Sequence, residues 1–332
     1  MKLFTKSCLF YLGIFFFILG TVSCKNDKKK EEKKENITDS IKTDEPFYKL
    51  SLAQWSLHKA IRDDKTLSNL DFAKKAKELG FEGIEYVSQL YPLTKGNEKA
   101  SLDSLVVELK KRSEEHGVQN VLIMIDGEGD LAVSDKAARD EAIKRHSKWI
   151  DAAAKLGCSS VRVNLFGGDA EKDAAQWHAN AVDGLGRLAA YGATKNINVI
   201  VENHGGRSSE ADKLVAVLKE INLPNCGALP DFGNFCYARD SGERWGGECT
   251  GQYDIYKGVA ELMPYAKGVS AKSRNFDEDG NEKDIDYFKM LKIVKDSGFK
   301  GFIGVEYEGN DLSEIEGILA TKALVIKATE NI

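Results

Sequence analysis

Two stretches of the sequence share one form, Leu79–Glu85 (LGFEGIE) and Ser297–Glu306 (SGFKGFIGVE). In each, an amphipathic segment ends at a glycine, an aromatic residue follows, and a β-rich run then ends in glutamate. A glycine at this place ends a helix by taking a left-handed conformation. The two stretches therefore indicate a repeated unit in which a helix is followed by a strand that ends in an acidic side chain.

Similar β-rich runs recur along the chain, separated by amphipathic segments such as Leu70–Leu79 and Ser134–Leu156. Strands that are connected by helices form a parallel sheet. Eight such units favour one closed (β/α)8 TIM barrel over an open sheet. No GxGxxG motif follows the first run, which argues against a dinucleotide-binding fold. The runs that predict strands are Leu52–Leu57, Gly83–Val87, Asn120–Ile125, Ser160–Leu165, Asn198–Glu202, Cys226–Leu229, Gly268–Ala271 and Gly301–Glu306.

The N-terminal segment predicts export and lipid anchoring. Lys2 and Lys6 precede a short apolar run, Leu9–Gly20, which is well under the length of about 20 apolar residues that spans a bilayer. We interpret residues 1–23 as a signal peptide, residues 24–46 as a disordered charged tether, and residues 47–332 as a single barrel domain. Cys24 follows small residues and resembles the lipidated cysteine of bacterial lipoproteins. That resemblance implies a lipid anchor facing the periplasm or cell surface; an uncleaved N-terminal anchor is the alternative.

Composition limits the partners and the cysteine chemistry. The net charge of −5 argues against a nucleic-acid track, which needs clustered Lys and Arg. Cys158 and Cys226 begin predicted strands and are expected in the core. Cys236 and Cys249 share one predicted loop, and the sequence leaves open whether an oxidising compartment bridges them. It also leaves open whether the protein is an oligomer.

Polar side chains gather at the predicted strand ends, where a TIM barrel has its active site. Residues i and i+2 of a strand share a face, so Glu202 and His204 point the same way. The carboxylates of Glu202, Asp231 and Glu306 would converge on the barrel axis, and their repulsion would raise their pKa values. A divalent ion removes that cost: oxygen ligands suit Mg²⁺ or Mn²⁺, and a nearby imidazole admits Zn²⁺ or Co²⁺. The strand-end residues are Gln54, Ser56, His58, Glu85, Arg162, Asn164, Glu202, Asn203, His204, Asp231, Asn234, Ser270, Lys272, Glu306 and Glu308.

Further substrate contacts are expected around this centre. His58 and Glu85 are candidates from the first two strands, and both residue types also occur in purely structural roles. The segment Phe235–Tyr256 is interpreted as a loop that covers the site, with Trp245 as a stacking surface for a sugar; a structural excursion is the alternative. The remaining histidines lie in predicted helices or loops and are assigned no role.

At these residues the chain resembles the xylose-isomerase-like TIM barrels known as sugar phosphate isomerases/epimerases. The resemblance extends from about Tyr48 to the C-terminus and depends on the order of its motifs along consecutive strands. The motifs are Gly83–Val87 (GIEYV), Val161–Asn164 (VRVN), Val201–Gly206 (VENHGG), Pro230–Phe235 (PDFGNF) and Gly304–Tyr307 (GVEY).

The resemblance implies roles for several residues. Ketose epimerases of this family hold a divalent metal with Glu, Asp, His and Glu on strands 5 to 8, which match Glu202, Asp231 and Glu306 here. The two glutamates exchange protons beside the sugar carbonyl while the metal stabilises the enediolate. The chain departs from the pattern at two positions, where Ser270 and Asn234 replace histidines. Lys272 could supply part of the missing charge, and His204 could become a ligand. Arg162, Asn164, Asn234 and Trp245 are the expected substrate contacts.

Three functions follow as alternatives. The first is an isomerase or epimerase that moves a proton beside the carbonyl of a keto sugar or related polyol. The second is a lyase or hydratase that acts on 3-keto-glycosides or similar oxidised sugars, because phosphorylated sugars are scarce outside the cytoplasm. The third is a carbohydrate-binding lipoprotein that has lost the chemistry, which the missing strand-7 histidine suggests.

Overall fold

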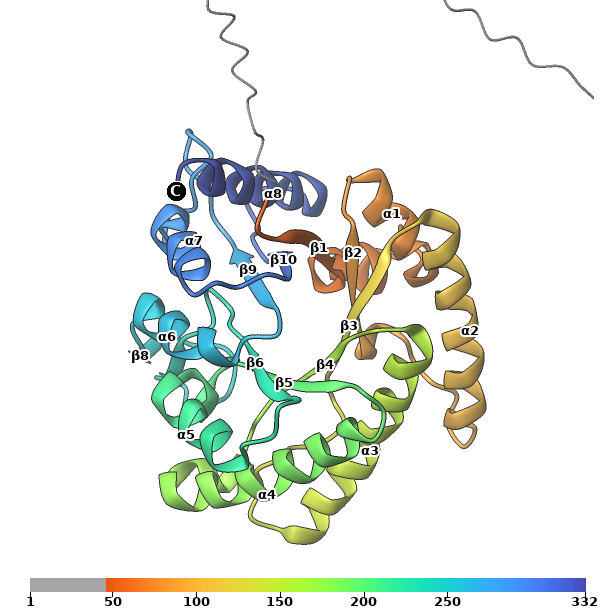
Figure 1. Cartoon of the computed structure of the whole chain (residues 1–332), viewed down its shortest axis with the longest axis vertical. Coiled ribbons are helices and arrows are strands. Elements are labelled where there is room, and N and C mark those ends of the chain that lie inside the picture. The colour runs from red at the N-terminus through yellow and green to blue at the C-terminus, as the bar shows by residue number, and fades with distance from the viewer. Residues whose placement is uncertain (1–45) are drawn as a thin grey trace, which may run out of the picture. The chain divides into compact units, whose positions relative to one another are not determined.

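Eight parallel strands form the centre of the protein in a computed structural model that describes residues 46–332. The expected signal peptide, Cys24 and nearly all of the expected tether lie outside the described residues. The strand order is β6-β5-β4-β3-β2-β1-β10-β9, and Figure 1 shows the strands arranged around one axis. The strands are β1 (Lys49–Ala53), β2 (Gly83–Val87), β3 (Gln119–Ile125), β4 (Ser160–Val163), β5 (Asn198–Glu202), β6 (Cys226–Leu229), β9 (Val269–Ser273) and β10 (Phe302–Tyr307).

The ends of this sheet, β6 and β9, meet through a short set of backbone contacts. Parallel bridges join Ala228 to Ala266 and Asp231 to Ser270. The Ser270 amide donates to the Pro230 carbonyl at 2.9 Å, and the Phe232 amide donates to the Ser270 carbonyl at 3.1 Å. The predicted TIM barrel is therefore confirmed, with its closure just beyond the end of β6.

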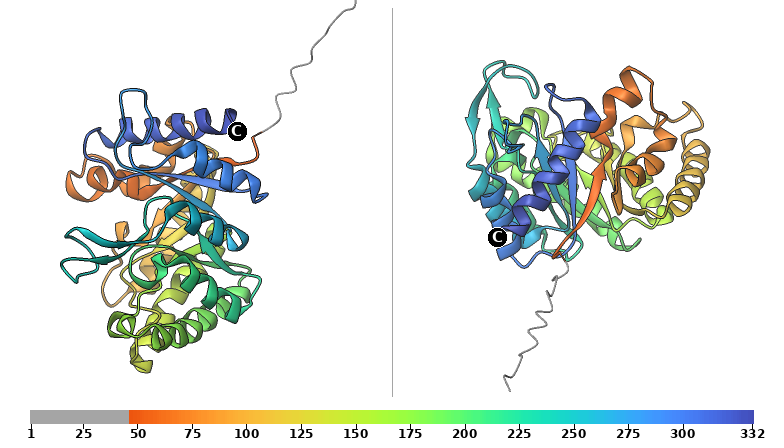
Figure 2. Two further views of the ribbon diagram at one scale, coloured as in Figure 1. Left: turned by 90° about the vertical axis from the view of Figure 1, so that its left-hand side faces the viewer. Right: turned by 90° about the horizontal axis from the view of Figure 1, so that it is seen from above.

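Within residues 46–332, eight α-helices follow the strands along the chain, and they surround the strands (Figures 1 and 2). Several begin where an Asp or Ser side chain accepts a hydrogen bond from the first turn; Asp135, Asp173 and Ser313 do so. Among the described residues, none of the helices has the length and apolar character needed to cross a membrane. The helices are α1 (Phe72–Glu78), α2 (Glu98–His116), α3 (Lys136–Leu156), α4 (Ala174–Ala193), α5 (Ala211–Ile221), α6 (Ile255–Leu262), α7 (Tyr287–Asp296) and α8 (Glu314–Glu330).

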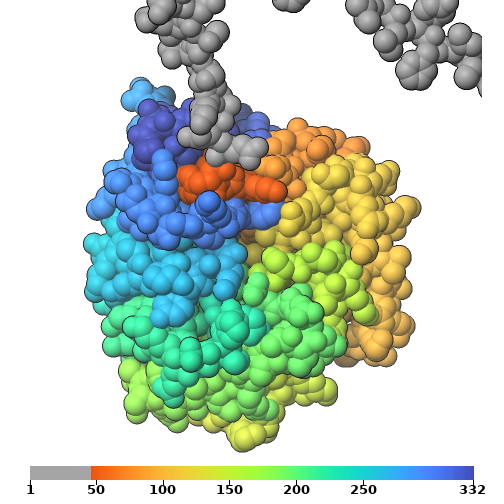
Figure 3. Space-filling view, in the orientation of Figure 1, coloured from red at the N-terminus to blue at the C-terminus, as the bar shows by residue number. Residues whose placement is uncertain are grey.

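The core fills the space between strands and helices. All five residues of β2 are buried, as expected for a strand covered on both faces. Cys158 and Cys226 are buried free thiols, which confirms their predicted core positions. In the space-filling view, side chains occupy much of the opening that the ribbons leave at the centre (Figure 3).

The first strand differs from its prediction. The sequence predicted Leu52–Leu57, but β1 ends at Ala53 and Gln54–Leu57 forms a 3₁₀ turn. The Gln54 side chain explains the difference, because it accepts a hydrogen bond from a β2 backbone amide that the backbone of a longer β1 would otherwise accept. The Gln54 amide donates to the Tyr91 hydroxyl at 2.8 Å and accepts from the Val87 amide at 3.0 Å.

The segment after β6 is also more regular than predicted. Within the expected loop, β7 (Cys236–Arg239) and β8 (Cys249–Gln252) form an antiparallel hairpin. A disulfide joins Cys236 to Cys249, with an S–S distance of 2.15 Å. The cysteine pairing that the sequence left open is therefore present in the structure.

Candidate active site

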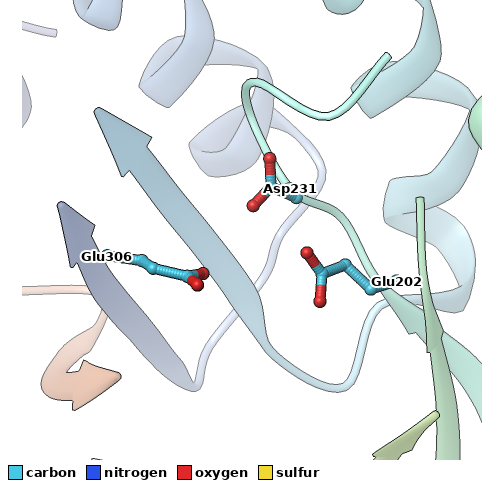
Figure 4. A group of neighbouring side chains, drawn as sticks. All are labelled: Glu202, Asp231 and Glu306. Atoms are coloured by element: carbon cyan, nitrogen blue, oxygen red, sulfur yellow. The ribbon is translucent and has the colours of Figure 1, made fainter. Parts of the chain in front are cut away.

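Three carboxylates converge where β5, β6 and β10 end. Glu202 is the last residue of β5, Asp231 follows β6, and Glu306 lies on β10. Their oxygens approach to within 4.8 Å of one another, and all three side chains are buried. Figure 4 shows Glu202 and Glu306 extending toward each other, with Asp231 beside Glu202. The convergence expected from the sequence is thus seen, while the catalytic and metal-binding roles of these residues stay predictions.

A serine links two of these carboxylates. The Ser270 hydroxyl lies 3.0 Å from Asp231 Oδ2 and 2.9 Å from Glu306 Oε2. A hydroxyl has one hydrogen to donate, so serving both contacts requires a proton on one of the carboxyl groups. Burial raises the pKa of both Asp231 and Glu306, which favours such a shared proton. Ser270 thus occupies the place where the resemblance implied a histidine ligand.

Lys272 adds a buried ammonium to the cluster. It lies on β9 and is only 1% exposed. Its Nζ lies 3.2 Å from Glu306 Oε1, 3.2 Å from Glu308 Oε2 and 3.6 Å from Asp231 Oδ2. Burial alone would lower the Lys272 pKa, but the attraction of Glu306 and Glu308 outweighs it and raises that pKa above its usual range. Lys272 is therefore charged at neutral pH.

A second cation neutralises the other side of the site. Arg162 on β4 places Nε 2.8 Å from Glu202 Oε2, and its Nη1 donates to Asp126 Oδ1 at 2.8 Å. Asn164 donates to the same Asp126 oxygen at 2.7 Å. The side-chain amide of Asn234 donates a hydrogen bond to the other Glu202 oxygen, Oε1, at 3.0 Å. Burial raises the Glu202 pKa to about 7, although Arg162 opposes that rise.

A cavity of about 510 Å³ opens over this cluster. Glu306 lines it, whereas Glu202 lies below, behind Arg162 and Asn234. His204 also lines the cavity, and burial with the nearby Arg162 lowers its pKa to about 4, so its imidazole is neutral at pH 7. Glu202 and His204 therefore belong to one site, but His204 stands outside the group of carboxylates.

The hairpin supplies the outer wall of this cavity. Trp245 belongs to the segment that connects β7 to β8. It is half exposed, and its ring centre lies 4.8 Å from that of His204. Arg244 stacks on the Phe166 ring at 3.7 Å and contacts Asp130 at 2.8 Å, which ties the hairpin to the loop after β3. A second cavity, of about 640 Å³, shares Trp245 with the first. The hairpin therefore contributes Trp245 to the cavity wall, while stacking of a sugar on this residue stays a prediction.

The sequence of residues 73–328 matches the family model for xylose isomerase-like TIM barrels. The chain belongs to this family. No curated protein sequence matches the chain.

Solved structures share the family fold at low identity. D-psicose 3-epimerase, determined with D-fructose, is 15% identical, with 85% of this chain and 97% of that chain covered at a TM-score of 0.60. 3-keto-D-glucoside 4-epimerase from E. coli is 14% identical, with 78% of this chain and 94% of that chain covered at a TM-score of 0.60. A xylose isomerase-like protein from Mycobacterium smegmatis, in complex with magnesium, is 18% identical, with 85% of this chain and 97% of that chain covered at a TM-score of 0.58. Similarity at this level shows the fold alone.

The family implies a divalent metal, and the three carboxylates could hold one by their spacing and oxygen chemistry. However, each of their six oxygens already has a protein partner, and Lys272 contacts two of the three residues. At a separation of about 4 Å and an effective dielectric constant of about 20, a divalent ion and an ammonium repel by about 8 kcal/mol. With Lys272 in place, the arrangement does not fit a divalent ion.

Two predicted substrate contacts lie away from the cavity walls. His58 stacks on Trp55 with ring centres 4.5 Å apart, and its Nδ1 lies 2.6 Å from the Trp55 carbonyl. It therefore supports Trp55, which does line the cavity. Glu85 is buried inside the barrel, accepts a hydrogen bond from Ser51 at 2.6 Å, and faces Gly304, where a Cβ would lie 2.6 Å from its Oε1.

Replacing Glu85 with Gln should stabilise the protein above neutral pH. Burial raises the Glu85 pKa to about 8, against 4.5 in the unfolded chain. Between these pH values the folded state binds the extra proton, so the stability of the natural protein falls as pH rises. The variant lacks this loss, and its advantage should grow by about 1.4 kcal/mol per pH unit. Urea unfolding at several pH values measures this difference in stability. The control variant Glu82→Gln, at an exposed residue, should show the same pH dependence as the natural protein. Identical pH profiles for the two variants would contradict the expectation.

Several cavity residues were not predicted from the sequence, among them Asp126, Arg239 and Arg274. Asp126 directly follows the predicted strand Asn120–Ile125, so its position at a strand end was a usable signal. Arg239 and Arg274 both line the two cavities. Arg239 depends on the hairpin and Arg274 on the loop after β9, and neither arrangement had a local sequence signal.

Proposed function

We propose that the protein is an enzyme of the sugar isomerase or epimerase kind, which moves a proton beside the carbonyl of a keto sugar. The observation that carries the proposal is the convergence of the buried Glu202 and Glu306, of which Glu306 lines a cavity of about 510 Å³. Carboxyl groups with raised pKa values suit general acid–base work near neutral pH. The sugar epimerases that share the fold support the same reading.

In the proposed reaction, Glu306 takes the proton from the carbon beside the carbonyl, because it is the member of the pair that lines the cavity. Glu202 returns a proton from the other side. Negative charge develops on the carbonyl oxygen and needs a cation in the low-dielectric site. A divalent metal was expected in that role from the sequence, but the arrangement around Lys272 does not fit one. The chain's own cations near this point are Lys272 and Arg162.

The cavity walls fit a carbohydrate. Trp245 offers an aromatic face, while Asn164 and Asn234 offer amide groups for hydroxyls. Aromatic faces bury apolar area, and a few placed polar groups fix orientation, as in other small-molecule sites.

A lyase or hydratase acting on 3-keto-glycosides is the second candidate. The second cavity favours it, because its wall is shared with the first and it offers room for a leaving group. The same proton abstraction would then expel the substituent at the β carbon. The two reactions differ in the mass of the product.

Incubation in deuterated water tests the function. We expect D-fructose, D-psicose, D-tagatose or methyl 3-keto-glucoside to gain one deuterium at the carbon beside the carbonyl, with products identified by mass spectrometry and NMR. A product of unchanged mass apart from deuterium supports isomerisation or epimerisation, and a released fragment supports the lyase. Binding without exchange would instead support a carbohydrate-binding protein.

We propose that the enzyme is exported and held to a membrane by lipid on Cys24, which the N-terminal sequence pattern supports. The Cys24→Ala variant should then lose incorporation of labelled fatty acid in cells and leave the membrane fraction or accumulate uncleaved. Unchanged lipid labelling would refute the assignment.

A further inference from the structure

We propose that Lys272 is the resident cation of the active site, so that proton transfer proceeds without a metal ion. The inference rests on the proposed function, because it names the group that stabilises the charge formed in that reaction. It concerns the one cation that contacts both Asp231 and Glu306 among the described residues.

Lys272 has the position of a built-in positive charge. Its Nζ lies 3.2 Å from Glu306 and 3.6 Å from Asp231, two of the three residues that converge as a possible metal cluster. The side chain reaches this point because residue 233 is glycine: a Cβ there would lie 3.0 Å from Lys272 Cγ. The backbone after β6 is thus shaped around the lysine stem.

Lys272 lines the second cavity, which adjoins the first at Asn234 and Trp245, so a ligand there can reach its donors. An ammonium carries three hydrogens, yet within residues 46–332 Nζ has close ionic contacts and no hydrogen bond of proper geometry. A buried donor group left in this state is costly. A substrate oxygen entering beside Glu306 would supply the missing acceptor, which is how a preorganised cation stabilises a developing oxyanion.

Ser270 holds the two carboxylates beside Lys272 together. A histidine at this place would offer a metal a nitrogen ligand, whereas the serine hydroxyl is engaged by both Asp231 and Glu306. The two carboxylates are held together by a hydrogen bond and an ammonium, with no ion needed between them. Asp231 and Glu306 are therefore both paired with protein groups.

The reaction balances with these groups alone. Glu306 removes the proton from carbon, the C–H electron pair becomes the new C=C bond, and the carbonyl π electrons move to oxygen. Lys272 donates a hydrogen bond to that oxygen and keeps its own proton. Return of a proton to carbon by Glu202 or Glu306 restores a carbonyl, and no oxidant or reductant is consumed.

Two measurements on the intact purified protein test the inference. After treatment with EDTA, deuterium exchange into the sugar should change less than about twofold, and calorimetry with Mn²⁺ should show no binding tighter than about 1 mM. Loss of exchange in EDTA with recovery on adding Mn²⁺, or a stoichiometric Mn²⁺ site with micromolar affinity, would overturn it. Should no sugar exchange under any condition, the proposed function fails, while the calorimetry still decides whether the cluster takes a metal.

Variants sharpen the test. Lys272→Met removes the charge and keeps the stem; exchange should fall at least about 100-fold and Mn²⁺ affinity should rise at least about 100-fold. Lys272→Arg keeps the charge and should keep Mn²⁺ out even if exchange is slow. Lys195→Met, at an exposed lysine paired with Asp151, is the matched control and should alter neither measurement. If Lys272→Met fails to fold, the measurements on the natural protein and on Lys272→Arg still decide the question.

Discussion

Glu306→Gln should reduce deuterium exchange of the epimer whose proton Glu306 removes by about 10³-fold, while leaving the fold intact. Glutamine keeps the shape of the side chain and can still contact Ser270, which lies 2.9 Å from Glu306 Oε2. It cannot accept a proton from carbon. Since Glu306 lines the cavity, no other carboxylate of the converging three is as well placed to substitute for it.

The comparison with Glu202→Gln separates the two sides of the sugar. If each glutamate serves one face, each variant should block exchange of one epimer and retain exchange of the other, with no net epimerisation by either. NMR of each epimer incubated separately in deuterated water measures this. Glu316→Gln, at an exposed residue of α8, should leave both exchanges unchanged. Full turnover by Glu306→Gln would refute the assignment of the base.

Arg162→Met is expected to lower the free energy of unfolding by about 3–5 kcal/mol. The guanidinium lies between Asp126 and Glu202, at 2.8 Å from each, and its side chain is only 5% exposed. Methionine fills much of the space but leaves two carboxylates without their counter-charge. Such groups are costly to bury, and both should then take up protons more readily.

Urea denaturation followed by circular dichroism measures this loss. Arg187→Met is the matched control, because Arg187 pairs with Asp140 and Asp183 on the surface and its side chain is 44% exposed. Exposed pairs contribute about 0–1 kcal/mol, so the control should stay close to the natural protein. Equal losses in the two variants would show that burial of the Arg162 pair has no special energetic role.

The residues at strand ends could be predicted because the barrel imposes its own geometry. Once eight βα units were recognised, Glu202, Asp231 and Glu306 had to lie at one end of a parallel sheet. Spacing of two residues also put Ser270 and Lys272 on one face, and both do reach the carboxylates. The sequence could not show that Lys272 packs against Gly233, because that contact joins β9 to the loop after β6.

Positions that depend on tertiary contacts were harder to predict. His58 was expected to face the substrate, but stacking on Trp55 holds it behind the wall. The hairpin lay within a predicted loop because Cys236 and Cys249 are 13 residues apart and the intervening residues have weak strand patterns. Its attachment through Arg244 and Asp130 links residues 114 apart in sequence, which no local pattern records.

The bridge between Cys236 and Cys249 makes the entrance to the site sensitive to the thiol chemistry around it. The barrel has its own core, but the strands that present Trp245 are two short segments outside it. In a reducing medium the barrel would keep its buried carboxylates in place, whereas the hairpin would be held only by its backbone pairing and by the contacts of Arg244. Maturation of the protein would then have two stages, folding of the barrel and formation of the Cys236–Cys249 disulfide. Only the second stage would depend on the redox conditions of the compartment.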